Sequence, residues 1–322
     1  MKYRKIEGID KPLSVFTFGT TGPAFSGNKK EAFRIYDDAW EEGFRTFDTA
    51  HTYGAGEETL GEWLYQTGRR NEAVILDKGC NPGQEGCDDV FSAQTIREQI
   101  EESLLKLRTD HVELYILHRD DKNIPVDTIV EELNRLKDEG KVLRFGGSNW
   151  TFERVLAANR YAEEHGLTGF TAVSPAFSLA DFIHDPWGGS VSIAGEQQAP
   201  FRAWLSETKT PVFCYSSLGR GYLSGKFRTD SGRPIEECIA KAPIMEYDAP
   251  INRERLHRAE LLAEEKGTAV TTICLAWLLH QPMEMFPLIA PSTREHMREN
   301  IRALDLSLSE QECRWLLTGV KD

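Results

Sequence analysis

The stretch FRTFDTAHTYGAGEETLGEWLYQTGRRNEAVILDKG, residues 44–79, contains two short apolar runs separated by a segment with helical periodicity. It predicts strands at 44–47 and 73–76 and a helix at about 58–66 between them. Asp48 directly follows the first strand, and Lys78 ends the second. A strand, a helix and a second strand in this order form the repeating unit of parallel α/β proteins.

The same alternation continues on both sides of this stretch. Further strands are predicted at 15–18, 112–117, 142–145, 170–173, 211–215 and 286–289. Helices are predicted at 29–43, from Ser92, from an N-cap at Asp127 to Gly140, from Thr151, at 252–266 and at 268–280. Eight strands that alternate with helices are the number needed to close a (β/α)8 TIM barrel, which is the predicted fold.

Two observations bear on how the barrel is organised. No linker-like break in composition interrupts the chain, so we predict a single domain over residues 1–322. An open doubly wound sheet that bound a dinucleotide would need a G-x-G-x-x-G turn after an early strand. The early Gly19-Thr20-Thr21-Gly22 segment lacks that spacing, which favours the barrel.

Composition narrows the range of partners. The chain has 38 Lys and Arg against 51 Asp and Glu, a formal net charge of −13, which disfavours nucleic acid and anionic lipid as partners. The first 13 residues contain several charged side chains where a signal peptide would need an apolar run, and no stretch of about 18 apolar residues suits a membrane span. We therefore expect a cytoplasmic protein without a membrane partner. Since no C-x-x-C pair occurs, we expect reduced thiols and no metal site from the cysteines, which are Cys80, Cys87, Cys214, Cys238, Cys274 and Cys313.

Four side chains that can hold or transfer a proton are predicted to meet at the mouth of the barrel: Asp48, Tyr53, Lys78 and His118. Asp48, Lys78 and His118 stand at strand ends, and Tyr53 follows Asp48 by five positions. A lysine at the end of an apolar strand needs a carboxylate partner, and Asp48 on the adjacent strand is the better candidate. Asp77 is the alternative, but strand alternation points it away from Lys78.

This set of residues can reduce a carbonyl group. The oxygen of a carbonyl that accepts hydride becomes negative and needs a proton from an acid nearby. Tyr53 is the predicted acid, and the Lys78 ammonium would stabilise its phenolate. Asp48 would hold Lys78, and His118 would orient the carbonyl oxygen by a hydrogen bond.

Six segments, in order, resemble the aldo-keto reductase family. They are FDTAHTYGAGEETLGEWL at 47–64, LDKG at 76–79, LYILHRDD at 114–121, GGSNW at 146–150, YSSLGRGYLSGK at 215–226 and LIAPSTREHMREN at 288–300. The resemblance covers nearly the whole chain. It implies a (β/α)8 barrel, a catalytic tetrad of the four residues above, and a nicotinamide dinucleotide bound without the G-x-G-x-x-G turn.

The resemblance also implies the cofactor contacts. Ser148 and Asn149 would hold the nicotinamide carboxamide, with Tyr215 stacked on the ring. Ser174 stands where most members carry a glutamine, and His296 replaces a more usual glutamine. The remaining cofactor residues are placed at Gly19, Thr20, Ser216, Leu218, Gly219, Gly221, Lys226, Ser292, Thr293, Arg294 and Asn300.

Coenzyme choice depends on two cations. Relatives that prefer the 2′-phosphate often carry Lys or Arg near 292 and 293, where this chain has Ser292 and Thr293. Arg294 and Lys226 offer cationic contacts instead, so NADP(H) is favoured over NAD(H), which remains an alternative.

Two long connections, 179–200 and 219–250, follow predicted strands on the face where active sites form. Trp187 either walls the substrate pocket or pins its loop to the barrel. Arg119 and Asp120 either meet a polar substrate or pair with loop residues. We assign Trp187 and Arg119 to the substrate side of the site.

We therefore predict an NADPH-dependent oxidoreductase that reduces an aldehyde, ketone or sugar carbonyl to the alcohol, with Tyr53 as proton donor. One alternative is a nicotinamide-binding regulatory or accessory subunit on the same fold. Another is an alcohol or sugar dehydrogenase that works in the oxidative direction. The sequence leaves the substrate, the direction and the oligomeric state open.

Overall fold

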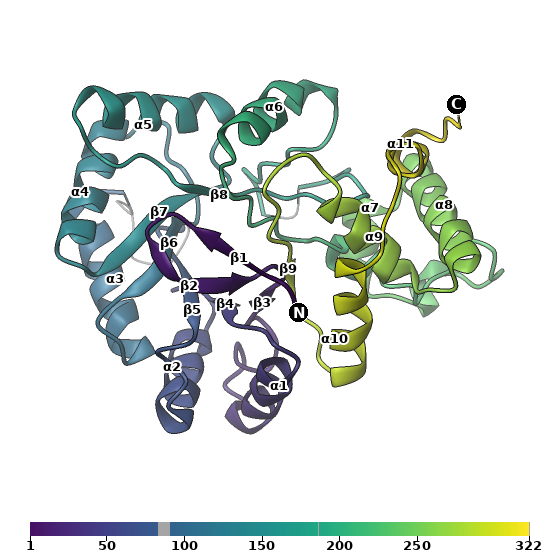
Figure 1. The fold of residues 1–322 in the computed structure, drawn as a ribbon, viewed down its shortest axis with the longest axis horizontal. Helices are drawn as coiled ribbons and strands as arrows, with labels where there is room; N and C mark the ends of the chain where they lie inside the picture. Colours follow the sequence, from purple (N-terminus) through teal and green to yellow (C-terminus); the bar gives the residue numbers. More distant parts are fainter. Residues whose placement is uncertain (83–90, 186, 322) are drawn as a thin grey trace.

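A computed structural model describes residues 1–82, 91–185 and 187–321. A seven-stranded parallel sheet lies at its centre, in the order β8-β7-β6-β5-β4-β3-β9 (Figure 1). The strands are β3 (Thr17–Gly19), β4 (Thr46–Asp48), β5 (Val74–Gly79), β6 (Val112–Leu117), β7 (Val142–Ser148), β8 (Ala172–Ser174) and β9 (Leu288–Ile289). Seven of the eight predicted strands are therefore present; β6 has the predicted bounds, and the others have shifted ends.

The eighth predicted strand, at 211–215, is wrong as a regular strand, because only isolated bridges form there. Val212 bridges Val173 on one side and Met285 on the other, while β9 pairs with β3. These bridges continue the parallel pairing from β8 round to β3, so the sheet curls into a (β/α)8 barrel as predicted. Backbone hydrogen bonds still join the segment to both neighbours, since the Phe213 N–H donates to the Val173 carbonyl at 2.8 Å and the Leu288 N–H donates to the Cys214 carbonyl at 2.9 Å.

Helices surround the barrel. In the first half they are α1 (Lys29–Glu41), α2 (Gly56–Thr67), α3 (Ala93–Leu107), α4 (Val126–Asp138) and α5 (Phe152–Glu164). Ser92 and Thr151 cap α3 and α5 as predicted, each accepting a backbone N–H through its hydroxyl oxygen. The predicted cap of α4 is wrong: Pro125 holds the N-cap position, and Asp127 lies in the first turn.

The second half is richer in short helices than the sequence predicted. Its elements are η1 (Glu196–Gln198), α6 (Ala199–Thr208), η2 (Gly219–Gly221), η3 (Ile235–Glu237), α7 (Lys241–Tyr247), α8 (Pro250–Lys266), α9 (Val270–Leu279), α10 (Arg294–Ile301), η4 (Arg302–Leu304) and α11 (Glu310–Thr318). The two long connections thus contain η1, η2, η3 and α7. On the described part of the chain, no helix is both long and apolar enough to cross a membrane.

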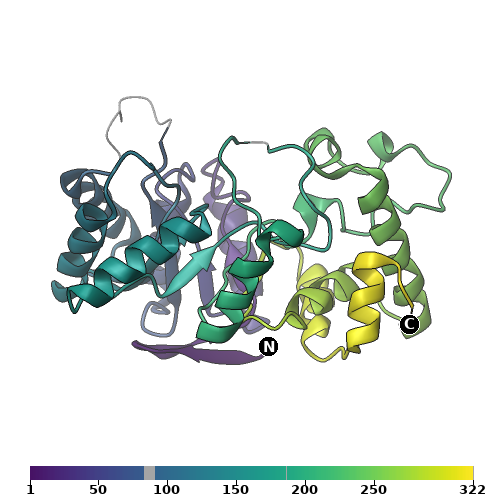
Figure 2. The ribbon, with the colours of Figure 1, turned by 90° about the horizontal axis from the view of Figure 1, so that it is seen from above.

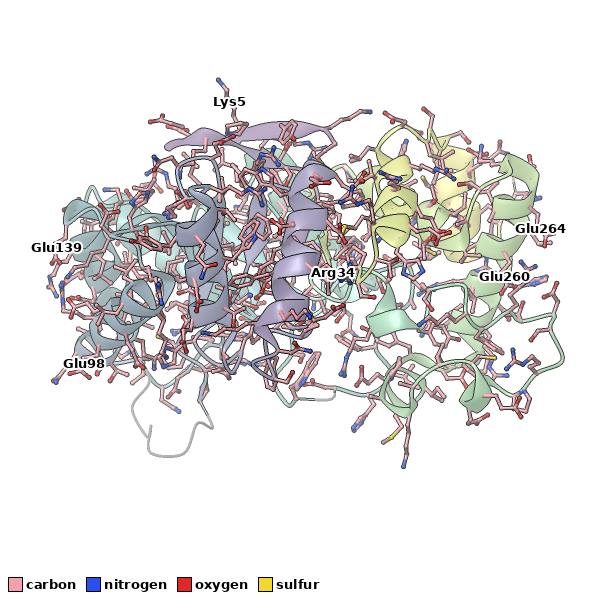
Figure 3. All side chains as sticks on the ribbon, turned by 90° about the horizontal axis from the view of Figure 1, so that it is seen from below. Lys5, Arg34, Glu98, Glu139, Glu260 and Glu264 are labelled. Atoms are coloured by element: carbon pink, nitrogen blue, oxygen red, sulfur yellow. The ribbon has the colours of Figure 1, made fainter. Side chains whose placement is uncertain are left out.

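An N-terminal hairpin that the sequence did not predict closes one end of the barrel. It consists of β1 (Tyr3–Ile6) and β2 (Ile9–Ser14), which pair antiparallel. Ile6, Ile9 and Leu13 are buried in one cluster with inward-facing strand residues. Figure 2 shows the hairpin along one edge of the barrel, and Figure 3 marks Lys5 on it. The loops after the strands lie at the opposite edge, where the site is built.

The cysteines contribute mostly to packing. Cys214 and Cys274 are fully buried free thiols, and Cys238 and Cys313 are partly buried free thiols. Burial raises the pKa of the Cys214 thiol to about 12, which keeps it protonated. Cys87 lies outside the described residues.

The contact between α2 and α3 gives a direct test of the fold. A Cβ on Gly61 would lie 2.5 Å from the backbone of Leu107. We expect Gly61→Ala to lower the free energy of unfolding by about 1–3 kcal/mol, because two backbones must separate. Urea denaturation followed by circular dichroism measures this change. Gly22→Ala is the control, since nothing lies within 4 Å of its Cβ position; equal losses for both variants would contradict the packing argument.

Candidate active site

Asp48 and Lys78 form a buried ion pair where β4 and β5 end. Both side chains are 3% exposed, and the Lys78 ammonium contacts the Asp48 carboxylate directly. Lys78 Nζ also donates to the Thr49 carbonyl oxygen at 3.1 Å and lies 3.5 Å from the Tyr53 hydroxyl. The structure thus gives Lys78 the carboxylate partner that the sequence predicted, and brings the ammonium to the phenol.

His118 completes the group from β6. Its backbone N–H donates to the Gly79 carbonyl at 2.7 Å, which ties the end of β6 to β5. The imidazole meets the Tyr53 ring edge-on, with centroids 5.6 Å apart. Its Nδ1 atom is buried without a hydrogen-bond partner among the described residues. All four predicted catalytic residues are therefore neighbours at one mouth.

The electrostatic environment fixes the protonation of these groups. Burial acts to lower the pKa of Lys78, but the Asp48 carboxylate and the Tyr53 phenol outweigh it and the pKa is raised. Burial, followed by the charges of Lys78 and Arg119, holds the pKa of His118 well below its usual value. Burial also raises the pKa of Tyr53, against the opposing effect of Lys78. At neutral pH the site therefore contains an ammonium, a neutral imidazole and a protonated phenol.

A pair of carboxyl groups lies behind the ion pair, on the helix side of β5. Asp77 and Glu57 are 0% and 1% exposed, and no donor among the described residues satisfies their oxygens. The nearest cations to Glu57 Oε2 are Lys106 Nζ at 3.6 Å and His51 Nδ1 at 4.0 Å. Burial, together with the charge of Glu57, raises the pKa of Asp77 well above its usual value. A proton on Asp77 thus gives the pair its hydrogen bond.

Sequence reasoning missed this pair. Glu57 has the pattern of an acid in the first turn of a helix, which α2 confirms, and nothing local indicates that its side chain is buried. An aspartate inside an otherwise apolar strand, as at Asp77, is the one signal that pointed to it. Glu57 and Asp77 connect the helix that follows Tyr53 to the strand that carries Lys78.

The residues assigned to the nicotinamide end lie side by side. Ser148 Oγ donates to the Ser174 carbonyl oxygen at 2.8 Å, and Asn149 Nδ2 donates to Ser148 Oγ at 3.0 Å. The Tyr215 hydroxyl donates to Asn149 Oδ1 at 2.7 Å. Ser174 Oγ donates to the Phe213 carbonyl oxygen at 2.8 Å, so its hydroxyl is already used within the barrel wall.

Two more residues from the first strand border the ion pair. Gly19 pairs with Asp48 in the β3–β4 register, and the backbone N–H of Thr20 donates to the Asp48 carbonyl at 3.0 Å. Thr20 is buried. The predicted Gly19 and Thr20 therefore lie at the same strand ends as the catalytic group.

The segment after Tyr215 borders a cavity of about 300 Å3. Its backbone has positive φ at Ser216 (54°), Gly219 (56°) and Gly221 (104°), and nothing lies within 4 Å of a Cβ position on Gly221. Leu218 precedes η2, and Lys226 lines the cavity. An open backbone turn next to an exposed lysine suits a pyrophosphate group, so the residues here fit the dinucleotide that the family implies.

The residues predicted for the adenosine end lie in α10 and the turn before it. The Thr293 hydroxyl oxygen caps α10, and Arg34, marked on α1 in Figure 3, donates to the Ser292 carbonyl at 3.1 Å. Arg294 Nη2 lies 2.6 Å from both Asp38 Oδ1 and Glu41 Oε2 of α1. Asn300 is buried in α10. The cation predicted to face a 2′-phosphate is thus held by two carboxylates.

At the mouth, Trp187 contacts both long connections. Its ring meets Tyr215 edge-on at 6.1 Å between centroids, and Arg220 lies over the indole at 4.8 Å. Trp187 remains 48% exposed. Asp120 pairs with Arg154 at 2.8 Å, so of the two residues that follow His118 only Arg119 is left to meet a ligand at the mouth.

Comparison with known proteins agrees with this fold. The model of the aldo/keto reductase family matches residues 16–316, and the chain belongs to that family. It is similar to an uncharacterized oxidoreductase, YrpG, of Bacillus subtilis, at 30% identity over 98% of this chain and 95% of the relative. Norsolorinic acid reductase stcV of Emericella nidulans is 33% identical over 88% of this chain and 70% of the relative. An NADP(+) aryl-alcohol dehydrogenase of Phanerodontia chrysosporium is 24% identical, covering 90% and 76%.

The buried Asp77 should make stability depend on pH. Its raised pKa means that the folded protein keeps a proton that the unfolded chain loses above about pH 3.9. Stability from this group is therefore present below that pH and is lost as the pH rises towards the folded pKa. At pH 8 we expect Asp77→Asn to unfold at a higher urea concentration than the parent. The difference in free energy of unfolding between variant and parent should be larger at pH 8 than at pH 4.5, by more than about 1 kcal/mol.

Urea titrations of both proteins at the two pH values measure this double difference. The exposed Asp138→Asn variant is the control and should show no such dependence, because its side chain is 74% exposed. An equal effect of Asp77→Asn at both pH values would show that Asp77 carries no raised pKa.

Proposed function

We propose that this oxidoreductase reduces an aldehyde or ketone to the alcohol with a nicotinamide coenzyme, and that Tyr53 donates the proton. The observation that carries the proposal is the contact between Lys78 and Tyr53, with the ammonium 3.5 Å from the phenol oxygen and held by Asp48. A phenol that gives up its proton becomes negative, and an adjacent buried ammonium stabilises that charge.

Each neighbour has a separate part in this step. The substrate oxygen binds between the Tyr53 hydroxyl and His118, whose neutral imidazole orients it by a hydrogen bond. As negative charge develops on that oxygen, the Tyr53 proton moves to it and Lys78 stabilises the phenolate left behind. Asp48 keeps Lys78 in place and balances its charge. The same groups work in reverse, with the phenolate accepting the proton of an alcohol.

The coenzyme supplies the hydride when it is bound. We propose that Ser148, Asn149 and Tyr215 hold its nicotinamide, that the turn at 216–221 with Lys226 holds the pyrophosphate, and that 292–300 holds the adenosine. NADP(H) is the proposed coenzyme. Arg294 would exchange its carboxylate partners on α1 for the 2′-phosphate, which places two acids next to that phosphate.

The relatives named norsolorinic acid reductase and aryl-alcohol dehydrogenase support an aromatic carbonyl or alcohol as substrate. The aromatic rings of Trp187 and Tyr215 at the mouth fit such a compound by stacking or edge contact.

We propose that the barrel acts as one domain over residues 1–322.

The role of Tyr53 is tested by Tyr53→Phe. Removing the hydroxyl removes the acid, so kcat for benzaldehyde reduction should fall by about 100- to 10,000-fold. The affinity for coenzyme, measured by quenching of protein fluorescence, should stay within about 3-fold because Tyr53 acts on the carbonyl. Tyr65→Phe is the control, since Tyr65 is 70% exposed on α2. Near-parental turnover of Tyr53→Phe on every carbonyl reduced by the parent would contradict the proposal.

The coenzyme assignment is tested by Arg294→Gln. Loss of the guanidinium should weaken NADPH binding by about 10-fold or more and leave NADH binding within about 3-fold. Glu41→Gln should have the opposite sign and tighten NADPH binding, because it removes a competing carboxylate. Fluorescence titration of the parent and both variants with both coenzymes gives the six dissociation constants. Tighter binding of NADH than NADPH by the parent, with no effect of Arg294→Gln, would refute the assignment.

A further inference from the structure

Arg119 is a partly buried cation that forms no ion pair with the described residues. It follows His118 directly, and its carbonyl oxygen accepts a 2.8 Å hydrogen bond from Trp150 Nε1, which fixes the backbone. Its Nη1 atom is buried, and no hydrogen-bond partner for it exists in the part of the chain that the structure describes. A buried guanidinium donor is normally satisfied by a carboxylate or a carbonyl, so an open one points to a ligand.

The arginines around Arg119 are already satisfied. Arg154 binds both oxygens of Asp120, with contacts of 2.9 and 2.8 Å. Arg220 pairs with Glu246 while it lies over Trp187. Arg119 thus differs from Arg154 and Arg220 because no described residue accepts a hydrogen bond from its Nη1 atom.

The charge of Arg119 contributes to the pKa values of three side chains at the site. It is one of the charges that hold the pKa of His118 below its usual value, after burial and Lys78. It also opposes the rise that burial causes in the pKa values of Tyr53 and Tyr215. These three side chains border the place where the carbonyl is proposed to bind, so the guanidinium lies within electrostatic range of the same substrate.

Asp185 is an acid whose pKa the Arg119 charge helps to lower, but its oxygens accept other hydrogen bonds. They accept the backbone N–H groups of Trp187 at 3.1 Å and Ser190 at 2.8 Å, which fold the loop over the mouth. Burial raises the pKa of Asp185, and the Ser190 hydrogen bonds, the Trp187 amide and the Arg119 charge lower it overall. Asp185 is therefore ionised, and it leaves the Arg119 donors open.

We propose that Arg119 selects carbonyl substrates that carry a carboxylate, by donating hydrogen bonds from its guanidinium to that group. The inference rests on the proposed reductase function and names the substrate class of the same site. A guanidinium recognises a planar carboxylate through two parallel N–H donors, which a lysine ammonium does not reproduce. In a chain with a net charge of −13, a local cation is also what lets an anionic substrate enter.

Matched substrate pairs test this selection. The 2-, 3- and 4-carboxybenzaldehydes place the carboxylate at three distances from the carbonyl, and their methyl esters lack the charge. We expect the parent to prefer at least one acid over its ester by about 10-fold or more in kcat/KM. In Arg119→Gln, kcat/KM for that acid should fall by about 10- to 100-fold, with its ester within about 3-fold. Arg119→Lys should recover only part of the preference.

Two further variants separate the contact from general charge effects. Arg160→Gln removes one positive charge from the exposed end of α5 and should leave the acid-to-ester ratio unchanged. Asp185→Asn removes the competing negative charge and should raise the ratio. Two results for Arg119→Gln would overturn the proposal. One is an equal loss of kcat/KM on the acid and on its ester. The other is weaker binding of the coenzyme with unchanged binding of the acid.

A binding measurement keeps the test independent of turnover. Benzoate and methyl benzoate are titrated calorimetrically into the coenzyme complexes of the parent and of Arg119→Gln. Tighter binding of benzoate by the parent, lost in the variant, supports the proposal even where no aldehyde is turned over, in which case only the proposed function fails. Equal benzoate binding by parent and variant overturns the role of Arg119 whatever the turnover.

Discussion

The buried contact between the Lys78 ammonium and the Asp48 carboxylate is the interaction on which the rest of the site depends. Removing two charges from water is costly, and the cost is recovered only if each charge meets its partner in a fixed geometry. Parallel pairing of β4 with β5 provides that geometry by ending both strands at the same edge. The ammonium then has one remaining direction, towards the Tyr53 hydroxyl. The contacts that satisfy a buried lysine thus also place the phenol that we propose as the proton donor.

The two ends of the barrel differ in role: one is closed by apolar packing, and the other carries the polar groups of the site. Ile6, Ile9 and Leu13 of the hairpin close one end with apolar side chains, which leaves polar groups to gather at the other. The long connections cross that second end and are tied together there by Trp187, between Tyr215 and Arg220. Variation in these connections can change the substrate without disturbing the ion pair, because Asp48 and Lys78 lie on β4 and β5, outside both connections.

The positive charges of the site differ in how far they are already neutralised. Lys78 is fully paired and acts through its position, whereas Arg294 is held by Asp38 and Glu41 and must exchange them to bind a phosphate. Arg119 has no such partner at Nη1 among the described residues. In a chain of net charge −13, this gradation decides where an anion gains most by binding.

The sequence by itself determined the barrel, seven of its strands and the meeting of Asp48, Tyr53, Lys78 and His118 at one mouth. Period-two and helical patterns are local, and parallel strands bring their ends together whatever lies between them. Only the tertiary structure showed that the N-terminal hairpin closes one end of the barrel, that residues 211–215 pair through isolated bridges, and that Pro125 is the N-cap of α4. It also decided which charges are paired: Asp120 with Arg154, Arg294 with α1, and Glu57 buried against Asp77. Charge pairing depends on contacts between side chains far apart in the chain. Sequence periodicity reports only local structure, so it does not predict these contacts.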